Sequence, residues 1–226
     1  MVIGNGNVAM DVARMLALTD RELRQTDTAD HAIEALDRKG VREIVVLGRR
    51  GPAQAAFTNP EIKELGEMED ADVIVDPAEV ELDPASAAFL ESDEVDKTTR
   101  VNVETLREFS QREPQGKKQR IVLRFLASPV EIKGDGKVES IVIGRNELVE
   151  EGGALRARDT GEREELECGL VLRSVGYTGI PIEGVPFDER RGLILNEGGR
   201  VLDSHDAGHK VGHYTAGWIK RGPSGV

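Results

Sequence analysis

Two adjacent arginines, Arg49 and Arg50, follow the apolar run Ile44–Leu47, which is typical of a buried strand. A glycine lies on each side of the pair, so the strand is expected to end in a tight turn. Two guanidinium groups at one point offer a phosphate several charge-assisted hydrogen bonds in a fixed plane. An acidic side chain there would instead accept a hydrogen bond from a ribose hydroxyl and repel a phosphate. The pair therefore favours a ligand that carries a phosphate on its ribose.

A glycine-rich turn at the start of the chain supplies the other half of such a site. Residues 2–9 read Val-Ile-Gly-Asn-Gly-Asn-Val-Ala, the G-x-G-x-x-A form of the dinucleotide-binding fingerprint. Gly4 allows the tight turn, Gly6 lets the backbone approach a pyrophosphate, and the small Ala9 lets the following helix pack closely on the strand. Without a ligand these residues would be only a turn between a strand and a helix. Together with the arginine pair they predict binding of NADP(H), with the phosphates at the helix N-terminus.

The spacing between the two motifs is unusual. The residue that recognises the ribose usually lies about twenty residues beyond the glycines, and Arg49 lies about twice as far away. Residues 19–36 account for the difference, because their pattern predicts an extra helical insertion that Lys39-Gly40 closes as a C-cap.

The composition limits the class of protein. The chain has 226 residues, a formal net charge of −12 and one cysteine. This length suits one good core, or one domain plus part of another, and the negative charge argues against non-specific nucleic-acid binding. One cysteine gives no disulfide framework, and no apolar stretch is long enough to span a bilayer. We therefore expect a cytoplasmic protein without a membrane span.

Other reactive side chains do not form a convincing site. Three histidines recur every four residues near the C-terminus: His205, His209 and His213. Two intervening glycines would break the helix that makes this spacing useful, so we expect no metal site. Cys168 lies in an apolar run and is interpreted as a small buried hydrophobic residue, not as a redox thiol. No Ser-His-Asp or Cys-His arrangement is evident, and no catalytic acid, base or nucleophile is predicted.

The apolar pattern predicts an α/β fold. Strands at 2–3, 44–47 and 73–75 alternate with helical segments, the last of them around 103–109. The pattern then changes to antiparallel strands. We assign them to residues 121–126, 129–132 and 138–143, with Gly134-Asp135-Gly136 as a hairpin signal. Residues 148–167 are highly charged and predict an exposed edge hairpin. A last strand ends near Gly176, where we expect the chain to leave one domain and begin another.

Three motifs resemble those of one enzyme family. They are residues 4–14, residues 48–65 with their Gly-Arg-Arg-Gly-Pro start, and residues 217–226, which read Gly-Trp-Ile-Lys-Arg-Gly-Pro-Ser-Gly-Val. In these motifs the chain resembles the adrenodoxin-reductase-like ferredoxin–NADP reductases, FAD-containing enzymes built from an FAD domain and an NADP domain. The similarity covers almost the whole chain. The last motif is the most specific, since the other two also occur in the broader group of flavoproteins with two dinucleotide-binding domains.

The resemblance implies a set of cofactor-binding residues. The NADP pyrophosphate would contact Asn5, Gly6, Asn7 and Val8, the 2′-phosphate Arg49 and Arg50, and the nicotinamide half Glu61, with Glu64 shaping the same region. Trp218 would face the flavin, Gly225 would touch both the flavin and the nicotinamide end, and Val226 would touch the flavin.

The resemblance also implies the fold and the activity. Residues 1–173 would form a Rossmann-like NADP-binding domain with an inserted antiparallel β-ribbon, and 174–226 a returning part of the FAD-binding domain. The implied enzyme is an oxidoreductase that passes hydride between NADPH and FAD and single electrons to an iron–sulfur ferredoxin. Because the first strand is shorter than the usual length of about five residues and the chain stops inside a cofactor loop, we expect a fragment. The fragment alone should be inactive, because the resemblance implies that flavin binding needs an amino-terminal glycine motif that this sequence does not contain.

Two alternatives remain open at this point. An NADPH-linked electron-input subunit of a glutamate-synthase-type flavoprotein shares the glycine turn and the basic pair, but is expected to carry an acidic residue where Trp218 stands. A non-catalytic NADP-binding domain would bind the nucleotide without a flavin.

Overall fold

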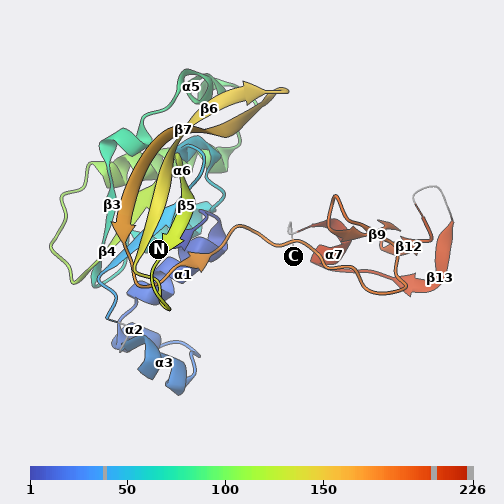
Figure 1. Ribbon diagram of the computed structural model, residues 1–226, viewed down its shortest axis with the longest axis horizontal. Helices are drawn as coiled ribbons and strands as arrows, with labels where there is room; N and C mark the ends of the chain where they lie inside the picture. Colours follow the sequence, from blue (N-terminus) through green and yellow to red (C-terminus); the bar gives the residue numbers. More distant parts are fainter. Residues whose placement is uncertain (38–39, 205–207, 223–226) are drawn as a thin grey trace. The chain divides into compact units, whose positions relative to one another are not determined.

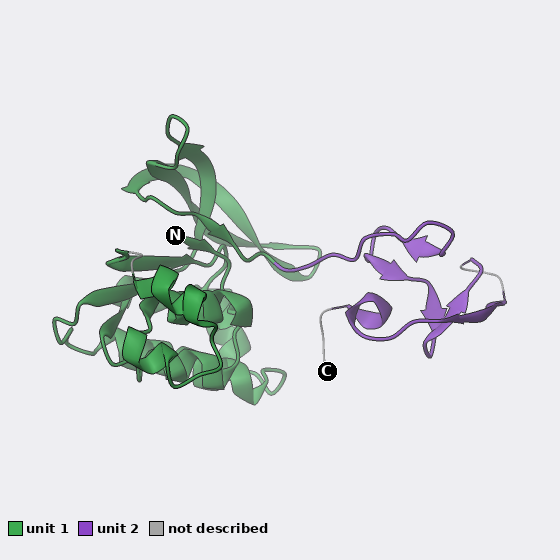
Figure 2. Cartoon of the chain, turned by 90° about the horizontal axis from the view of Figure 1, so that it is seen from below, with its two compact units in different colours: residues 1–175 green, residues 176–226 purple. Residues whose placement is uncertain are grey.

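The computed structural model (Figure 1) describes residues 1–37, 40–204 and 208–222. It divides into two compact units, Met1–Val175 and Gly176–Val226, coloured separately in Figure 2. No helix in the described ranges is long and apolar enough to cross a membrane.

The first unit is built on a parallel sheet with the strand order β3-β4-β2-β1-β8. Its strands are β1 (Val2–Ile3), β2 (Glu43–Leu47), β3 (Ala71–Val75), β4 (Gln119–Arg124) and β8 (Leu172–Arg173). The predicted strands at 2–3, 44–47 and 73–75 are confirmed, as is the α/β class. The antiparallel assignment of residues 121–126 was wrong, because β4 pairs parallel with both β2 and β3. A short apolar run does not reveal strand direction, which here follows from the long helical crossover before β4.

Three helices cover one face of this sheet: α1 (Asn7–Ala17), α4 (Asn59–Leu65) and α6 (Lys97–Ser110). The predicted helices through residue 16 and around 103–109 are confirmed. Ala9, Ala13 and Ala17 recur every fourth residue of α1 and are fully buried. These small side chains let α1 lie close to the strands, as the fingerprint requires.

The predicted insertion consists of two short helices, α2 (Asp20–Leu23) and α3 (Asp30–Asp37), which project from the unit in Figure 1. Thr19 ends the preceding loop and forms a capping box with Glu22. Of the predicted C-cap, Gly40 has a left-handed φ of 60°, and Lys39 lies outside the described residues. Three further helical segments lie between β2 and α6: the 3-10 helices η1 (Pro52–Gln54) and η2 (Pro77–Val80), and α5 (Pro84–Glu91).

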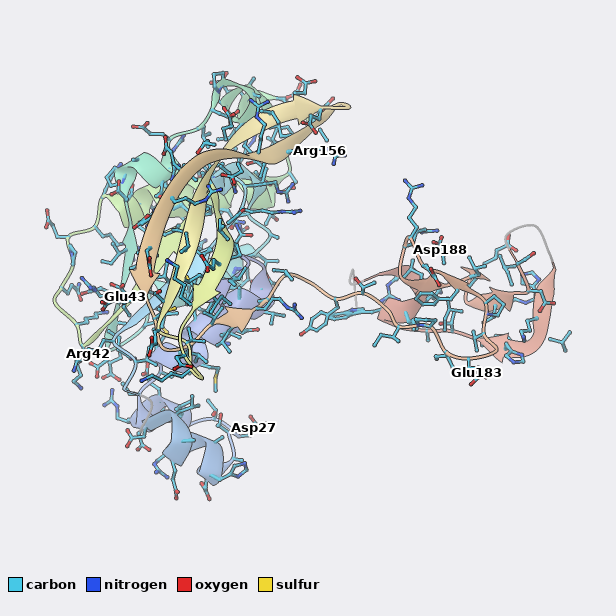
Figure 3. The ribbon with its side chains drawn as sticks, viewed as in Figure 1. Asp27, Arg42, Glu43, Arg156, Glu183 and Asp188 are labelled. Atoms are coloured by element: carbon cyan, nitrogen blue, oxygen red, sulfur yellow. The ribbon has the colours of Figure 1, made fainter. Side chains whose placement is uncertain are left out.

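An antiparallel sheet of β5 (Ala127–Lys133), β6 (Ser140–Glu151) and β7 (Ala154–Glu167) covers the other face of the parallel sheet. Figure 2 shows the helices on one side of the unit and these long strands on the other. Ala127, Ile141 and Ile143 pack with Leu47 in a second buried cluster, against which Cys168 is half-buried. The predicted hairpin turn between β5 and β6 is confirmed. The β6–β7 edge hairpin is confirmed too, and Figure 3 shows its charged Arg156 near the tip.

The second unit is small and irregular. It contains β9 (Phe187–Asp188), β10 (Leu193–Ile194), β11 (Asn196–Glu197), β12 (Arg200–Leu202), β13 (His209–Tyr214) and the short helix α7 (Trp218–Arg221). Its strands form two antiparallel sheets, β10-β9 and β11-β12-β13, in the described residues. The Asn196 side chain donates hydrogen bonds to the carbonyls of Ile194 and Lys220, and so fastens α7 to the strands.

Candidate functional site

The position of Gly4, the first glycine of the fingerprint, lies where the three parallel strands β2, β1 and β8 end side by side. Gly4 has a φ of 115°, and a Cβ added there would lie 1.9 Å from the Ser174 carbonyl oxygen. Its N–H donates to the Leu47 carbonyl (2.9 Å), while the Ser174 N–H donates to the Ile3 carbonyl (2.7 Å). Only glycine meets both conditions, so the turn between β1 and α1 is set by the packing of β2, β1 and β8.

The second glycine leaves the start of α1 open. Gly6 is the N-cap of α1, and within the described part of the chain no side chain caps the helix and no atom lies within 4 Å of a Cβ added there. The first turn, Asn7 to Met10, carries no acidic residue. An uncapped helix N-terminus presents free N–H groups and the positive end of the helix dipole, which together suit an anion such as a pyrophosphate.

The arginine pair lies beside this turn despite its distance in sequence. β1 and β2 are parallel neighbours with Ile3 opposite Leu47, so both strands end at the same edge of the sheet. A Cβ added to Gly48 would lie 2.5 Å from Asn5 Nδ2, which places the Asn5 side chain directly over the start of the basic turn. The insertion of α2 and α3 therefore lengthens the chain between the motifs without separating them.

Both arginine side chains are available to a ligand. Arg49 is exposed and Arg50 half-buried, and no carboxylate in the described ranges forms an ion pair with either guanidinium group. In Figure 3, Arg42 and Glu43 mark the opposite end of β2. There Glu43 is paired with Arg120 (2.6 Å). Arg49 and Arg50 thus lie just beyond the carboxyl end of β2, next to the open N-terminus of α1.

Glu61 is joined to the fingerprint through Asn7. The Thr58 N–H donates to Asn7 Oδ1 (2.8 Å), and Asn7 Nδ2 donates to Glu61 Oε1 (3.4 Å). The Thr58 hydroxyl donates to the other oxygen of Glu61. Glu64, one turn further along α4, pairs with Arg14 of α1 (2.5 Å). The structure thus brings Glu61 and Glu64 to the side of α1 that carries Asn7.

The motifs gave no indication of Asn102, which supports this loop from α6. It is 2% exposed, its Nδ2 donates to the Phe57 carbonyl (2.8 Å), and its Oδ1 accepts from Asn59 Nδ2 (2.7 Å). The sequence could have indicated Asn102 in one way. It is a polar residue on the buried face of an amphipathic helix, which it shares with Leu106 and Phe109, and buried polar side chains need hydrogen-bond partners.

The predicted flavin-facing residues belong to the second unit. Trp218 opens α7 and is 51% exposed, with its ring centroid 5.9 Å from that of Tyr177. Gly217 and Gly222, at the two ends of α7, have φ values of 70° and 92°. Gly225 and Val226 lie outside the described residues. Of the three histidines, His209 lies near Glu197 (3.1 Å), the His213 ring contacts the Val211 carbonyl (2.9 Å), and His205 lies outside the described ranges.

Comparison with known proteins gives a consistent result. The chain is 52% identical over 229 residues to the NADPH-ferredoxin reductase FprA of Mycobacterium tuberculosis, a match that covers 100% of this chain and 48% of that protein. It is 33% identical over 239 residues to the mitochondrial NADPH:adrenodoxin oxidoreductase of Arabidopsis thaliana, covering 100% of this chain and 49% of that protein. No protein-family model matches.

Solved structures agree with the sequence comparison. The structure of Mycobacterium tuberculosis FprA in complex with NADPH matches with a TM-score of 0.89 and 51% identity, covering 100% of this chain and 48% of that one. The chain spans about half the length of the curated relatives named here. Over its whole length, the chain is therefore similar to an NADPH-ferredoxin reductase and to an NADPH:adrenodoxin oxidoreductase.

Proposed function

We propose that this chain is the NADP(H)-binding portion of a flavoprotein ferredoxin–NADP reductase. One observation carries the proposal: parallel pairing of β1 and β2 puts two arginines beside the N-terminus of α1, and among the described residues neither arginine has an ion-pair partner and no side chain caps the helix. These groups suit the two phosphate positions of NADP(H), the 2′-phosphate and the pyrophosphate. The similarity supports the assignment, since the names of the two relatives combine NADPH with ferredoxin or adrenodoxin.

Each part of the site has a proposed task. Asn5, Gly6, Asn7 and Val8 bind the pyrophosphate, chiefly through backbone N–H groups. Arg49 and Arg50 bind the 2′-phosphate, and Glu61, held by Asn7 and Thr58, lies along the nicotinamide half. Residues 1–173 form the NADP-binding domain in this proposal, and 174–226 belong to the FAD-binding domain.

The second unit offers features that fit a flavin. Trp218 presents an exposed aromatic surface, and a Cβ added to Gly217 or Gly222 would meet no atom of the described residues within 4 Å. A planar ring system can therefore approach both the indole and the backbone at α7. A bound FAD would supply the chemistry that links hydride transfer from NADPH to single-electron transfer to an iron–sulfur ferredoxin. The residues of this chain bind and orient the nucleotide, and we propose no acid or base among them.

The nucleotide half of the proposal is tested by binding of NADP⁺ and NAD⁺ to the chain in a calorimeter. Replacing Arg49 and Arg50 together with alanine should weaken NADP⁺ by at least about tenfold, because each charge-assisted hydrogen bond contributes about 1.5–3 kcal/mol. Binding of NAD⁺, which lacks the phosphate, should change little. Equal loss for both nucleotides would refute the assignment of the pair.

The chain offers a matched control for net charge. Arg190 and Arg191 are another exposed pair followed by a glycine, in the second unit. Their double replacement with alanine removes the same charge but should leave both affinities unchanged.

The redox half is tested separately, as NADPH-dependent reduction of a ferredoxin by the native polypeptide that carries this sequence. Nucleotide binding without flavin absorbance or ferredoxin reduction there would favour the non-catalytic alternative.

A further inference from the structure

The turn that carries the two arginines is held by the first residues of the antiparallel sheet. The Gly48 carbonyl accepts a hydrogen bond from the Ala127 N–H (3.0 Å), and the Arg50 carbonyl accepts one from the Leu126 N–H (3.1 Å). Between them, the Arg49 carbonyl accepts from Asn146 Nδ2 (2.9 Å). Three consecutive carbonyls of the basic turn are thus fixed by a small region that we call the sheet root: Leu126, Ala127, Ser128 and Asn146.

Asn146 is the one member of the sheet root that acts on the turn through its side chain. It is 5% exposed, and its amide nitrogen donates to Ser128 Oγ (2.7 Å) as well as to the Arg49 carbonyl. A buried amide donor without acceptors is unfavourable, so the partners hold each other in one arrangement. Substitution of Asn146 would free the Arg49 backbone without removing either guanidinium group.

The pairing beside Asn146 is irregular. Gly144 of β6 pairs with Arg163 and Asn146 with Asp159, so one residue of β6 faces three residues of β7, and the extra residues lie in β7. The alternation of β6 itself therefore continues, and Asn146 is buried on the same side of the strand as Ser140 and Gly144. Its hydrogen bond to the Arg49 carbonyl shows that this side chain faces the basic turn.

The backbone at the sheet root is also held in an unfavourable conformation. Leu126 has a φ of 50°, and no other non-glycine residue in the described part of the chain has a positive φ. Its N–H donates to the Arg50 carbonyl, and its own carbonyl accepts from the Asn146 N–H (2.7 Å). Such a conformation persists only where the surroundings fix it, and such sites often have a functional role. Here both hydrogen bonds lead to the basic turn or to Asn146.

We propose that Asn146 is a positioning residue that determines specificity for the 2′-phosphate. By fixing the Arg49 carbonyl, it holds the guanidinium groups of Arg49 and Arg50 in the geometry that a phosphate accepts. This inference rests on the proposed function, because it assumes that the pair binds that phosphate. In this proposal Asn146 acts through the Arg49 carbonyl and not by contact with the phosphate, so its effect falls on the basic turn and not on the backbone N–H groups at Gly6.

The physical argument predicts a change in selectivity. Hydrogen bonds from a guanidinium fork to a phosphate depend on direction, so a turn that can move loses part of them. NAD⁺ makes no such bonds and is insensitive to the exact position of the pair. Replacing Asn146 with leucine, of similar size but without a donor, should therefore weaken NADP⁺ by about tenfold and NAD⁺ by less than about twofold.

The experiment measures the ratio of the two affinities in the same sample of the 226-residue chain by calorimetry. A partly unfolded sample lowers the number of sites for both nucleotides equally, so the ratio reports on the site alone. Asn102→Leu is the matched control, since it also removes a buried amide that holds a loop of the site. It should affect NADP⁺ and NAD⁺ alike, because Phe57 and Asn59, its partners, lie outside the basic turn.

A milder variant keeps the test decisive if Asn146→Leu does not fold. Ser128→Ala removes the second acceptor of the Asn146 amide and should lower the ratio by about twofold to threefold. If Asn146→Leu folds, an unchanged ratio of NADP⁺ to NAD⁺ affinity in that variant would overturn the inference. If Asn146→Leu does not fold, an unchanged ratio in Ser128→Ala would overturn it. Failure of the proposed function looks different: the unmodified chain would bind NADP⁺ no more tightly than NAD⁺, and both proposals would fall.

Discussion

Replacing Gly4 with alanine tests whether the first glycine of the fingerprint is required by the fold and not by the ligand. The φ of 115° at Gly4 is a conformation that alanine rarely adopts, and the added Cβ would lie 1.9 Å from the Ser174 carbonyl oxygen. That oxygen belongs to the backbone that follows β8, so no side chain can rotate away to relieve the contact. The structure thus predicts that the substitution harms the protein even when no nucleotide is present.

The size of the effect follows from two contributions. A non-glycine residue forced into a sparsely populated backbone conformation costs about 1–3 kcal/mol. To relieve the contact, the turn and β8 must separate by about 1 Å, which weakens the Ser174–Ile3 hydrogen bond by a further 0.5–1.5 kcal/mol or so. We expect a loss of about 3 kcal/mol in the free energy of unfolding. For a chain of this length that lowers the melting temperature by roughly 6–12 °C.

Gly6→Ala is the control, because Gly6 already has a φ of −92° and space for a methyl group. Its free energy of unfolding should stay within about 1 kcal/mol of the unmodified value, since a weaker N-cap is offset by a less flexible unfolded chain. NADP⁺ affinity should nevertheless fall by about tenfold or more, because the methyl group occupies the space where the pyrophosphate approaches the backbone.

Thermal and urea unfolding, followed by circular dichroism without nucleotide, measure the first effect, and calorimetry with NADP⁺ measures the second. The two glycines should give opposite patterns: Gly4→Ala loses stability, and Gly6→Ala loses affinity. If Gly4→Ala unfolds within about 0.5 kcal/mol of the unmodified chain, the argument from φ and the Ser174 contact is wrong.

Three further predictions concern the core, the pH dependence of stability and the second unit. Glu79 is 7% exposed and accepts hydrogen bonds from Arg124, Arg145 and the Phe125 N–H, so Glu79→Ala should lower the free energy of unfolding by about 3 kcal/mol. Glu164 is exposed and also pairs with Arg124 (2.9 Å), and Glu164→Ala should cost less than about 1 kcal/mol. Equal losses for the two variants would contradict this prediction. Burial opposes ionisation of Asp72, but backbone N–H groups of residues 115–117 hold the pKa of its carboxyl below the usual value. The stabilisation of the fold by ionised Asp72 is therefore complete above the unfolded pKa of about 3.9 and is lost as the pH falls through the lower folded pKa. Asp72→Asn should lower the free energy of unfolding by about 1–3 kcal/mol at pH 7, and by progressively less in urea titrations at acid pH. A difference between the two proteins that does not depend on pH would refute the assignment. In the native polypeptide, Trp218→Ala should change flavin fluorescence and slow hydride transfer while the NADP⁺ to NAD⁺ affinity ratio stays constant; unchanged fluorescence and rate would leave Trp218 a structural role only.

The local elements of the fold could be predicted because their signals are local. The glycine turn predicted the junction of β1 and α1, and Gly134-Asp135-Gly136 predicted the turn between β5 and β6, since each signal reflects the backbone conformation of a few adjacent residues. The insertion at 19–36 was also recognised, although as one helical segment where the structure has α2 and α3.

The errors and omissions concern contacts between distant residues. Residues 121–126 were assigned to an antiparallel ribbon, and most of them form a parallel strand between β2 and β3. Asn102 and Asn146 carry no motif, and each acquires its role through a carbonyl at least 45 residues away, at Phe57 and at Arg49. A hydrogen bond of this kind depends on how whole elements pack, which no short window of sequence contains.

The sequence alone determined which residues could bind a phosphorylated dinucleotide, because charge, the absence of a side chain at glycine and helix-forming pattern are properties of the residues themselves. The tertiary structure decided whether those residues meet. Arg49 lies more than 40 residues from Gly6, and only the parallel pairing of Ile3 with Leu47 brings the two turns to one edge of the sheet. The fixed geometry of the basic turn was likewise a tertiary result. The carbonyls of residues 48–50 accept hydrogen bonds from Leu126, Ala127 and Asn146, which lie beyond β4 and far from the turn in sequence.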